Sequence, residues 1–136
     1  MKKIIPIILA FVFCITLFSC SGSDPLNETM DKAIESLKNS GFTQSQEYNS
    51  EQIESIELGF KMSDLYTLNG EILRINHLIK PQNEGFEYVY IYLFENSEDA
   101  ESILESYAKY TSEYTKIVDR VLIFGSSAQI NQLEID

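Results

Sequence analysis

The sequence is poor in the side chains that most often carry catalysis or bind metals. Its 136 residues include a single histidine, His77, and two cysteines, Cys14 and Cys20. A nucleophilic triad needs a base beside the nucleophile, usually an imidazole, and no motif places a serine beside His77. A zinc site would need several histidine, cysteine or carboxylate ligands, and His77 supplies only one of them. We therefore expect His77 to be a structural or half-exposed residue, and we expect no metal and no cofactor.

Basic side chains are scarce as well. The chain has 10 lysines and arginines against 21 aspartates and glutamates, which gives a formal net charge of −11. This excess of negative charge argues against binding to nucleic acid and against binding to anionic lipid through a cluster of basic residues. The glycines are scattered and no Gly-Lys-Ser/Thr sequence follows them, so we expect no phosphate-binding loop.

The acidic residues are too numerous to indicate a site by themselves. One group of them falls near the start of a predicted helix: Glu95, Glu98, Asp99 and Glu101. Their spacing lacks the calcium loop of an EF-hand, and the positive end of a helix explains them without an ion. A hydrolase-type enzyme with two carboxylates across a cleft stays an alternative, because sequence alone does not select such a pair.

The start of the chain carries a targeting segment. Met1-Lys2-Lys3 is basic and Ile4 to Phe18 is almost wholly apolar, as in the first two regions of a secretory signal. The run is too short and wrongly flanked for a stable transmembrane helix. At its end, Leu17-Phe18-Ser19-Cys20 resembles the lipobox of bacterial lipoproteins, although Phe18 stands where that family usually has a smaller residue.

The resemblance implies that residues 1–19 are a signal peptide, cut before a Cys20 that carries a diacylglyceryl group. The family carries two or three acyl chains, enough for stable anchoring. The protein would then lie in the bacterial cell envelope, and Ser21 favours the outer membrane if the host has one. A signal peptide without lipid and an uncleaved anchor are the alternatives, but Leu17 is large for the former and the apolar run is short for the latter.

Cleavage before Cys20 would change both the charge and the cysteine content of the chain. It removes Lys2 and Lys3 and no acidic residue, so the net charge becomes −13. Cys14 leaves with the signal, and an acylated Cys20 has no free thiol. We therefore expect no disulfide and no thiol catalysis, and the acyl chains would be the only membrane attachment.

After a polar tether over residues 20–25, residues 26–136 predict one small acidic domain. Helical periodicity predicts helices over 26–39, 50–58 and 97–110, with a short last helix after Gly125. Strands are expected over 43–48, 71–79, 86–94 and 116–124, the last bent near its middle. Asn69-Gly70 is typical of a hairpin turn, here between residues 65–68 and 71–79.

This order of elements predicts an α+β fold, a two-layer sandwich of one sheet and its helices. The middle of the chain follows a βαββαβ order, which is that of a ferredoxin-like core with extra N- and C-terminal helices. That topology would place residues 43–48 at the centre of the sheet, and the segment is too polar for such a position. We therefore predict the α+β sandwich without fixing its strand order.

The strand over 86–94 has an aromatic residue at every second position. We call this set the aromatic ladder: Phe86, Tyr88, Tyr90, Tyr92 and Phe94. Neighbouring members would stand about 7 Å apart on one face, forming a platform for a sugar, a peptide or a protein surface. The aliphatic residues between them look like the helix-packed side, which would leave the tyrosines on an open face. The alternative is that helices or loops cover the ladder as core.

These observations favour a non-catalytic envelope lipoprotein that binds a protein or carbohydrate partner through the aromatic ladder. A structural or assembly role in an envelope complex is an alternative, in which the acidic surface would make the contact. The hydrolase-type enzyme is a third possibility, for which no catalytic motif is present.

Overall fold

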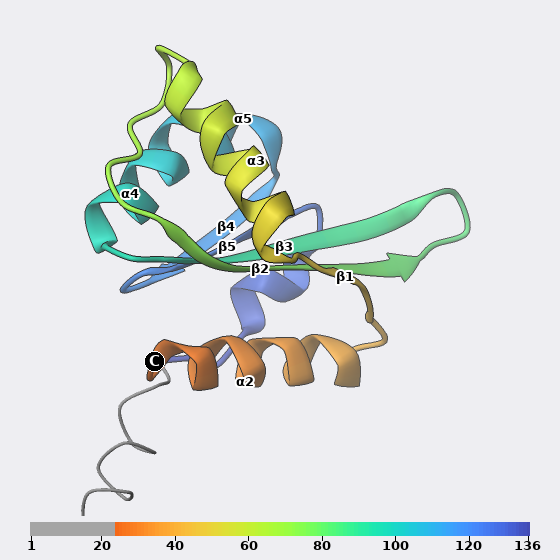
Figure 1. Ribbon diagram of the computed structural model, residues 1–136. Coiled ribbons are helices and arrows are strands. Elements are labelled where there is room, and N and C mark those ends of the chain that lie inside the picture. Colours follow the sequence, from red (N-terminus) through yellow and green to blue (C-terminus); the bar gives the residue numbers. More distant parts are fainter. Residues whose placement is uncertain (1–23) are drawn as a thin grey trace, which may run out of the picture.

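The computed structural model describes residues 24–136 (Figure 1). Its centre is a five-stranded antiparallel sheet with the strand order β1-β2-β3-β5-β4. The strands are β1 (Thr43–Glu47), β2 (Ile72–Pro81), β3 (Phe86–Phe94), β4 (Tyr114–Val118) and β5 (Val121–Gly125). The helices are α2 (Leu26–Asn39), α3 (Ser50–Met62), α4 (Ser97–Ile103) and α5 (Lys109–Thr111), with a π-helical turn (Leu104–Ala108) and a 3₁₀ helix (Ala128–Gln132). No helix within residues 24–136 has the length and apolar character needed to cross a membrane.

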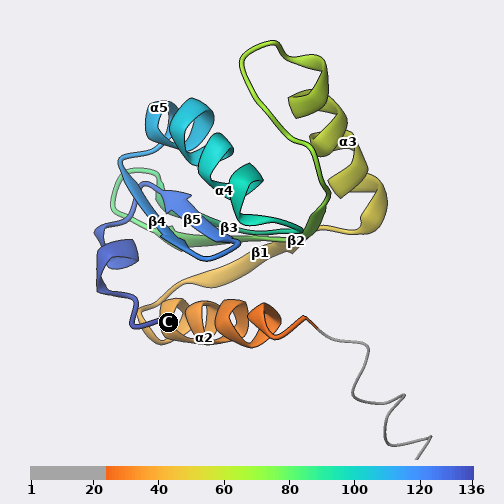
Figure 2. The same cartoon turned by 90° about the vertical axis from the view of Figure 1, so that its left-hand side faces the viewer.

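Helices cover both faces of the sheet. Figures 1 and 2 show α2 and the C-terminal 3₁₀ helix on one face, and α3 with the α4–α5 segment on the other. Each face has its own apolar cluster, because side chains alternate along β3. Val89, Ile91 and Leu93 lie in the cluster on the α2 side, whereas Tyr92 and Phe94 lie in the cluster beneath α3 and α4.

The α+β sandwich predicted from the sequence is confirmed, but it has helices on both sides of the sheet. The aliphatic residues of β3 do pack against a helix, as expected. The expectation that the tyrosines would face an open side is wrong, because α3 and α4 also have apolar faces that need a partner. Ile53 and Phe60 of α3 are buried against this side of the sheet, together with Ile103 of α4.

The polar strand β1 lies at the edge of the sheet and not at its centre. It pairs only with β2, and four of its five residues are exposed. An edge position suits the polar sequence Thr-Gln-Ser-Gln-Glu, because it needs only one hydrogen-bonded neighbour. The sheet therefore does not have the ferredoxin-like order that the βαββαβ pattern indicated. Its connections from β2 to β3 and from β4 to β5 are hairpins between neighbouring strands.

Two local predictions are also corrected. The hairpin at Asn69-Gly70 is wrong: the preceding residues form no strand, and the backbone N–H groups of Asn69 and Gly70 donate to the Asp99 carboxylate at 2.9 and 2.7 Å. The single strand over 116–124 is in fact two strands, β4 and β5. They are joined at Asp119, which has a φ of 52° and so reverses the chain.

An ion pair fixes the start of the described chain to the sheet. Arg120, in the turn between β4 and β5, donates two hydrogen bonds to Asp24, Nη1 to Oδ2 at 2.7 Å and Nη2 to Oδ1 at 2.8 Å. The same guanidinium donates to the carbonyl of Phe94 at 3.2 Å. The hydrogen bond from Arg120 lowers the pKa of Asp24, so this carboxylate stays ionised below the usual range.

Candidate binding cleft

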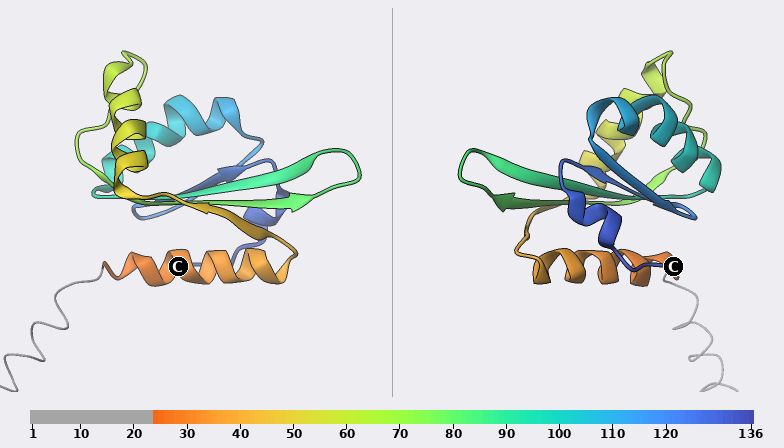
Figure 3. Two further views of the ribbon diagram at one scale, coloured as in Figure 1. Left: turned by 45° about the vertical axis from the view of Figure 1, so that its right-hand side comes forward. Right: turned by 180° about the vertical axis from the view of Figure 1, so that it is seen from behind.

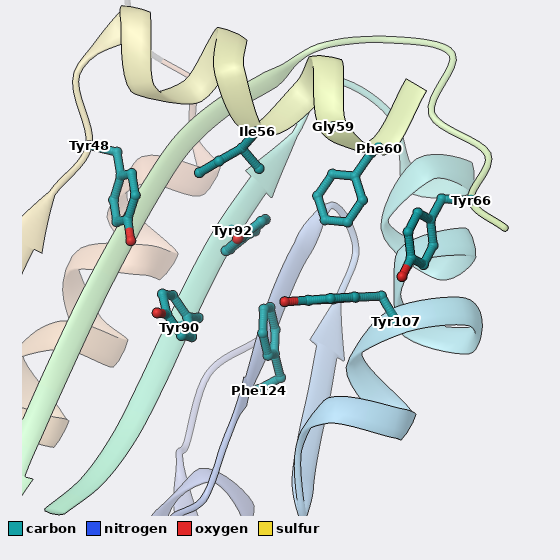
Figure 4. Close-up of a pocket in the computed structure, with 9 residues that line it drawn as sticks. All are labelled: Tyr48, Ile56, Gly59, Phe60, Tyr66, Tyr90, Tyr92, Tyr107 and Phe124. Atoms are coloured by element: carbon teal, nitrogen blue, oxygen red, sulfur yellow. The ribbon is translucent and has the colours of Figure 1, made fainter. Parts of the chain in front are cut away.

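A cleft of about 350 Å³ lies above the sheet, between α3 and the π-helical turn (Figure 4). We call it the aromatic cleft, because seven of its nine lining residues are tyrosine or phenylalanine. The lining consists of Tyr48, Ile56, Gly59, Phe60, Tyr66, Tyr90, Tyr92, Tyr107 and Phe124. These residues come from both helical segments, from the loops and from two neighbouring strands, so the cleft exists only in the folded domain.

The floor of the aromatic cleft is built by the pairing of β3 with β5. Tyr90 and Phe124 are register partners, and their side chains therefore share one face of the sheet. Their rings are stacked, with centroids 5.5 Å apart and an interplanar angle of 24°. Tyr92 adds a third ring, whose centroid is 5.2 Å from that of Phe124. The three rings form a continuous aromatic layer over two strands, in which Tyr92 and Phe124 are buried and Tyr90 is partly exposed.

Three further rings close one end of the cleft. Phe60 of α3, Tyr66 of the following loop and Tyr107 of the π-helical turn contact one another edge to face, with centroid separations of 5.2, 5.4 and 5.7 Å. Edge-to-face contacts of this kind stabilise an aromatic cluster beyond its buried area. Tyr48 stands at the opposite end, just after β1 (Figure 4). The walls thus hold together segments that are far apart in the sequence.

Tyr107 belongs to the π-helical turn between α4 and α5. Such turns are rare, interrupt the regular register of an α-helix and occur frequently at functional sites. In Figure 4 the Tyr107 hydroxyl points to the middle of the cleft, between Tyr92 and Phe124. The ring of Tyr107 is nearly perpendicular to that of Phe124, at 89° with centroids 6.0 Å apart.

The aromatic cleft carries no ionised side chain among its nine lining residues. Burial raises the pKa of the Tyr90, Tyr92 and Tyr107 phenols, and the neighbouring tyrosines add to this effect. All three hydroxyls therefore keep their protons at neutral pH and can both donate and accept hydrogen bonds. Phe60, Tyr92 and Phe124 are buried, so the site offers a ligand the accessible parts of the other four rings together with neutral phenol groups.

Two further cavities adjoin the aromatic cleft and share its residues. One, of about 350 Å³, shares Tyr90, Tyr107 and Phe124 and extends to His77. The other, of about 580 Å³, shares Tyr66 and Tyr107. Its outer lining includes Leu65 and Tyr110, which are 75% and 83% exposed. The shared side chains are common walls between neighbouring cavities.

His77, expected to be structural or half-exposed, is half-buried and lines the adjoining cavity of about 350 Å³. Its ring is stacked on that of Tyr90, with centroids 4.3 Å apart and an interplanar angle of 13°. Its Nδ1 atom lies 3.1 Å from the hydroxyl of Ser45 on β1. Burial lowers the pKa of His77, which favours the neutral imidazole at neutral pH.

The structure brings the five residues of the aromatic ladder to different places. Tyr90 and Tyr92 line the aromatic cleft, and Phe86 and Tyr88 line the adjoining cavity with His77. Phe94 is fully buried in the core under α4 and lines none of these three cavities. Cys20, the predicted lipidation site, lies outside the described residues.

Sequence reasoning missed five of the aromatic lining residues: Tyr48, Phe60, Tyr66, Tyr107 and Phe124. Each belongs to a different segment, so no periodic pattern connects them. The abundance of tyrosine, with eight in the chain, was the available signal, and five of the eight line this one cleft.

No group of acidic, histidine or cysteine side chains suited to a metal ion occurs within the part of the chain that the structure describes. None of the family models, curated proteins or solved structures compared with this chain matches it. The candidate site therefore has to be judged from its own geometry and chemistry.

Proposed function

We propose that this chain is a non-catalytic lipoprotein of the bacterial cell envelope whose domain binds a ligand in the aromatic cleft. The observation that carries this proposal is the convergence of seven aromatic rings on one open cleft of about 350 Å³. Small-molecule sites are concave, mostly apolar and usually between about 300 and 1,000 Å³, with a few polar groups that orient the ligand. The tyrosine hydroxyls would serve as those polar groups.

The position of the cleft is compatible with attachment through an acylated Cys20. That residue precedes Asp24 by four positions, so the chain between them spans at most about 14 Å. Asp24 leads into α2, on the face of the sheet opposite to α3 and α4 (Figure 3). A lipid at Cys20 would therefore hold the α2 side near the bilayer and leave the aromatic cleft directed away from it, open to ligands of the envelope.

Ligand binding is tested by a fragment screen on the full chain in dodecyl maltoside micelles. Saturation-transfer NMR would detect which small amines, sugars and peptides contact the protein. We expect the contacting fragments to lose their signal in Tyr107→Leu, because that variant removes a cleft wall while keeping an apolar side chain. Tyr110→Leu is the matched control, because Tyr110 is exposed and does not line the aromatic cleft.

Fragments that bind equally well to a folded Tyr107→Leu variant would place binding elsewhere and refute the proposed site. A screen without any saturable fragment would refute the ligand-binding function itself. The anchor is tested separately with Cys20→Ala, which we expect to leave the membrane fraction during washes without detergent. A Cys20→Ala chain that stays with the membranes would rule out acylation as the attachment.

A further inference from the structure

The dipeptide Asn69-Gly70, just before β2, combines a labile chemistry with an unusual set of backbone contacts. We propose that Asn69 is a site of spontaneous deamidation that the folded domain keeps inactive through the carboxylate of Asp99. The proposal does not depend on the aromatic cleft or on any ligand. It is carried by the exposure of Asn69, by the hydrogen bonds of the two backbone N–H groups and by the need for glycine at position 70.

Deamidation of Asn69 proceeds through attack by the backbone nitrogen of Gly70. The nitrogen gives up its proton and bonds to Cγ of Asn69, the side-chain amide takes up a proton and leaves as ammonia, and a five-membered succinimide ring remains. Water then opens the ring and leaves aspartate or isoaspartate, so water is the only co-reactant. Asn69 is exposed to water, and Gly70 has no side chain to hinder the attacking nitrogen.

The folded chain holds this nitrogen in a hydrogen bond to a buried carboxylate. The N–H of Gly70 donates to Oδ2 of Asp99 at 2.7 Å, and the N–H of Asn69 donates to Oδ1 at 2.9 Å. Asp99 is 1% exposed, and Nδ2 of Asn96 donates to its Oδ2 atom at 3.0 Å. Loss of the Gly70 proton would place an amide anion against a buried carboxylate, which is costly. The two bonds also restrict rotation of the backbone at Asn69, on which closure of the ring depends.

The two residues that follow are held in the same way. The N–H of Glu71 donates to Oε2 of Glu95 at 2.9 Å, and the N–H of Ile72 donates to Oε1 of Glu57 at 2.5 Å. Four successive N–H groups thus donate to carboxylates from α3, from the loop after β3 and from α4. Hydrogen bonds to ionised groups are the strong ones, so local opening of residues 69–72 requires the loss of several of them.

These contacts also require the glycine that makes Asn69 labile. A Cβ atom on Gly70 would lie 2.7 Å from Nδ2 of Asn96, 2.7 Å from Oε2 of Glu95 and 3.2 Å from Oδ2 of Asp99. All three atoms take part in the hydrogen bonds that hold residues 69–72, and a larger residue would displace them. The fold therefore keeps a reactive Asn-Gly pair and supplies the hydrogen bond that protects it.

The test follows deamidation of Asn69 by mass spectrometry. Trypsin cuts after Lys61 and Arg74, and Asn69 is the only asparagine in the peptide of residues 62–74, so the mass gain of that peptide reports this position alone. The full chain is incubated at neutral pH in dodecyl maltoside micelles and, in parallel, in enough urea to unfold it. We expect the folded chain to deamidate at least tenfold more slowly, because a hydrogen bond to a charged group shifts an equilibrium by about 10- to 150-fold.

Two variants separate the effect of Asp99 from that of folding in general. Asp99→Asn keeps the size of the side chain and removes its charge, and we expect the folded variant to deamidate Asn69 about tenfold faster than the original chain. Glu98→Gln is the matched control, because it removes an exposed negative charge of the same helix that makes none of these hydrogen bonds. This control should deamidate at the rate of the original chain.

Equal rates in the folded and the unfolded original chain would overturn the proposal. So would a folded Asp99→Asn chain that deamidates at the original rate or more slowly, since a slower rate would make the carboxylate a base that assists the attack. Acceleration by Glu98→Gln equal to that by Asp99→Asn would assign the effect to net charge and also overturn it. Amide hydrogen exchange of the original chain gives a check that needs no variant: the N–H of Gly70 should exchange slowly, and exchange as fast as in an unfolded chain would contradict the proposal.

Discussion

Asn76 provides the sharpest test of how the core on the α2 side is built. The residue lies in β2 with 0% of its surface exposed, and neither atom of its amide has a hydrogen-bond partner within the described residues. Alternate residues of a strand share a face, so Asn76 points the same way as Leu78 and Arg74. Leu78 belongs to the cluster on the α2 side, and Arg74 reaches Asp31 of α2 at 2.8 Å. The amide of Asn76 is therefore buried beneath α2.

Replacing Asn76 by leucine should stabilise the protein. Burial of an unpaired amide costs about 1–3 kcal/mol in proteins, and the leucine side chain is similar in length and adds apolar contacts. We expect Asn76→Leu to raise the free energy of unfolding by about 1–3 kcal/mol. For a domain of this size, 1 kcal/mol corresponds to a shift of roughly 4 °C in Tm, so the Tm should rise by about 4–12 °C.

The assay is urea unfolding of the full chain, followed by far-UV circular dichroism and tyrosine fluorescence. Asn76→Ala is the companion variant, because it removes the amide but leaves a cavity and should gain less than leucine does. The reasoning is refuted if Asn76→Leu folds to the same structure yet unfolds at a lower urea concentration than the original chain. That result would mean that the amide makes favourable hydrogen bonds in the native protein.

Two glycines and the histidine give further predictions. A Cβ atom on Gly125 would lie 2.0 Å from the carbonyl oxygen of Tyr88, so Gly125→Ala should prevent β5 from pairing with β3 and yield no folded protein. Gly59→Ala meets nothing within 4 Å and should stabilise α3 by about 0.5–1 kcal/mol in the same urea assay; a loss would contradict this. Burial lowers the pKa of His77 from 6.5, so the unfolded chain takes up a proton first. Its contribution to stability is complete above pH 6.5 and is lost as the pH falls toward the folded pKa. His77→Gln should lack this pH dependence of the urea midpoint, and identical pH profiles for both proteins would exclude the assignment.

Elements whose own residues follow one regular pattern of apolar and polar side chains could be predicted from the sequence. The apolar stripe of α2 and the strict alternation of β3 predict both elements with the bounds that the structure has. The turn at Asn69-Gly70 could not be predicted, because its two N–H groups bind Asp99, which lies about thirty positions further along the chain. Contacts across such a distance leave no local pattern, so a common hairpin signal was overridden by a tertiary hydrogen bond.

The lining residues of the candidate site likewise include some that the sequence pattern indicates and others that it does not. Tyr90 and Tyr92 are marked by their place in an alternating strand. Phe124 joins them only because β5 pairs with β3 in one register, and Phe60 only because α3 packs over that face. Tyr107 occupies its position in a π-helical turn, whereas its sequence pattern indicates an ordinary helix. The lining of the aromatic cleft is thus a product of strand order and helix placement, which periodicity does not specify.

The ion pair between Arg120 and Asp24 also determines how the domain bears mechanical load. Tension on the chain before Asp24 passes through two parallel hydrogen bonds into the β4–β5 turn, and through the same guanidinium to the carbonyl at the end of β3. Part of this force therefore reaches β3, β4 and β5 directly and does not pass through α2 alone. Arg120 lowers the pKa of Asp24. This ion pair therefore stays ionised when the pH falls to the range in which an aspartate usually titrates. A domain tethered through the chain before Asp24 would therefore keep Asp24 bound to the β4–β5 turn in mildly acidic surroundings.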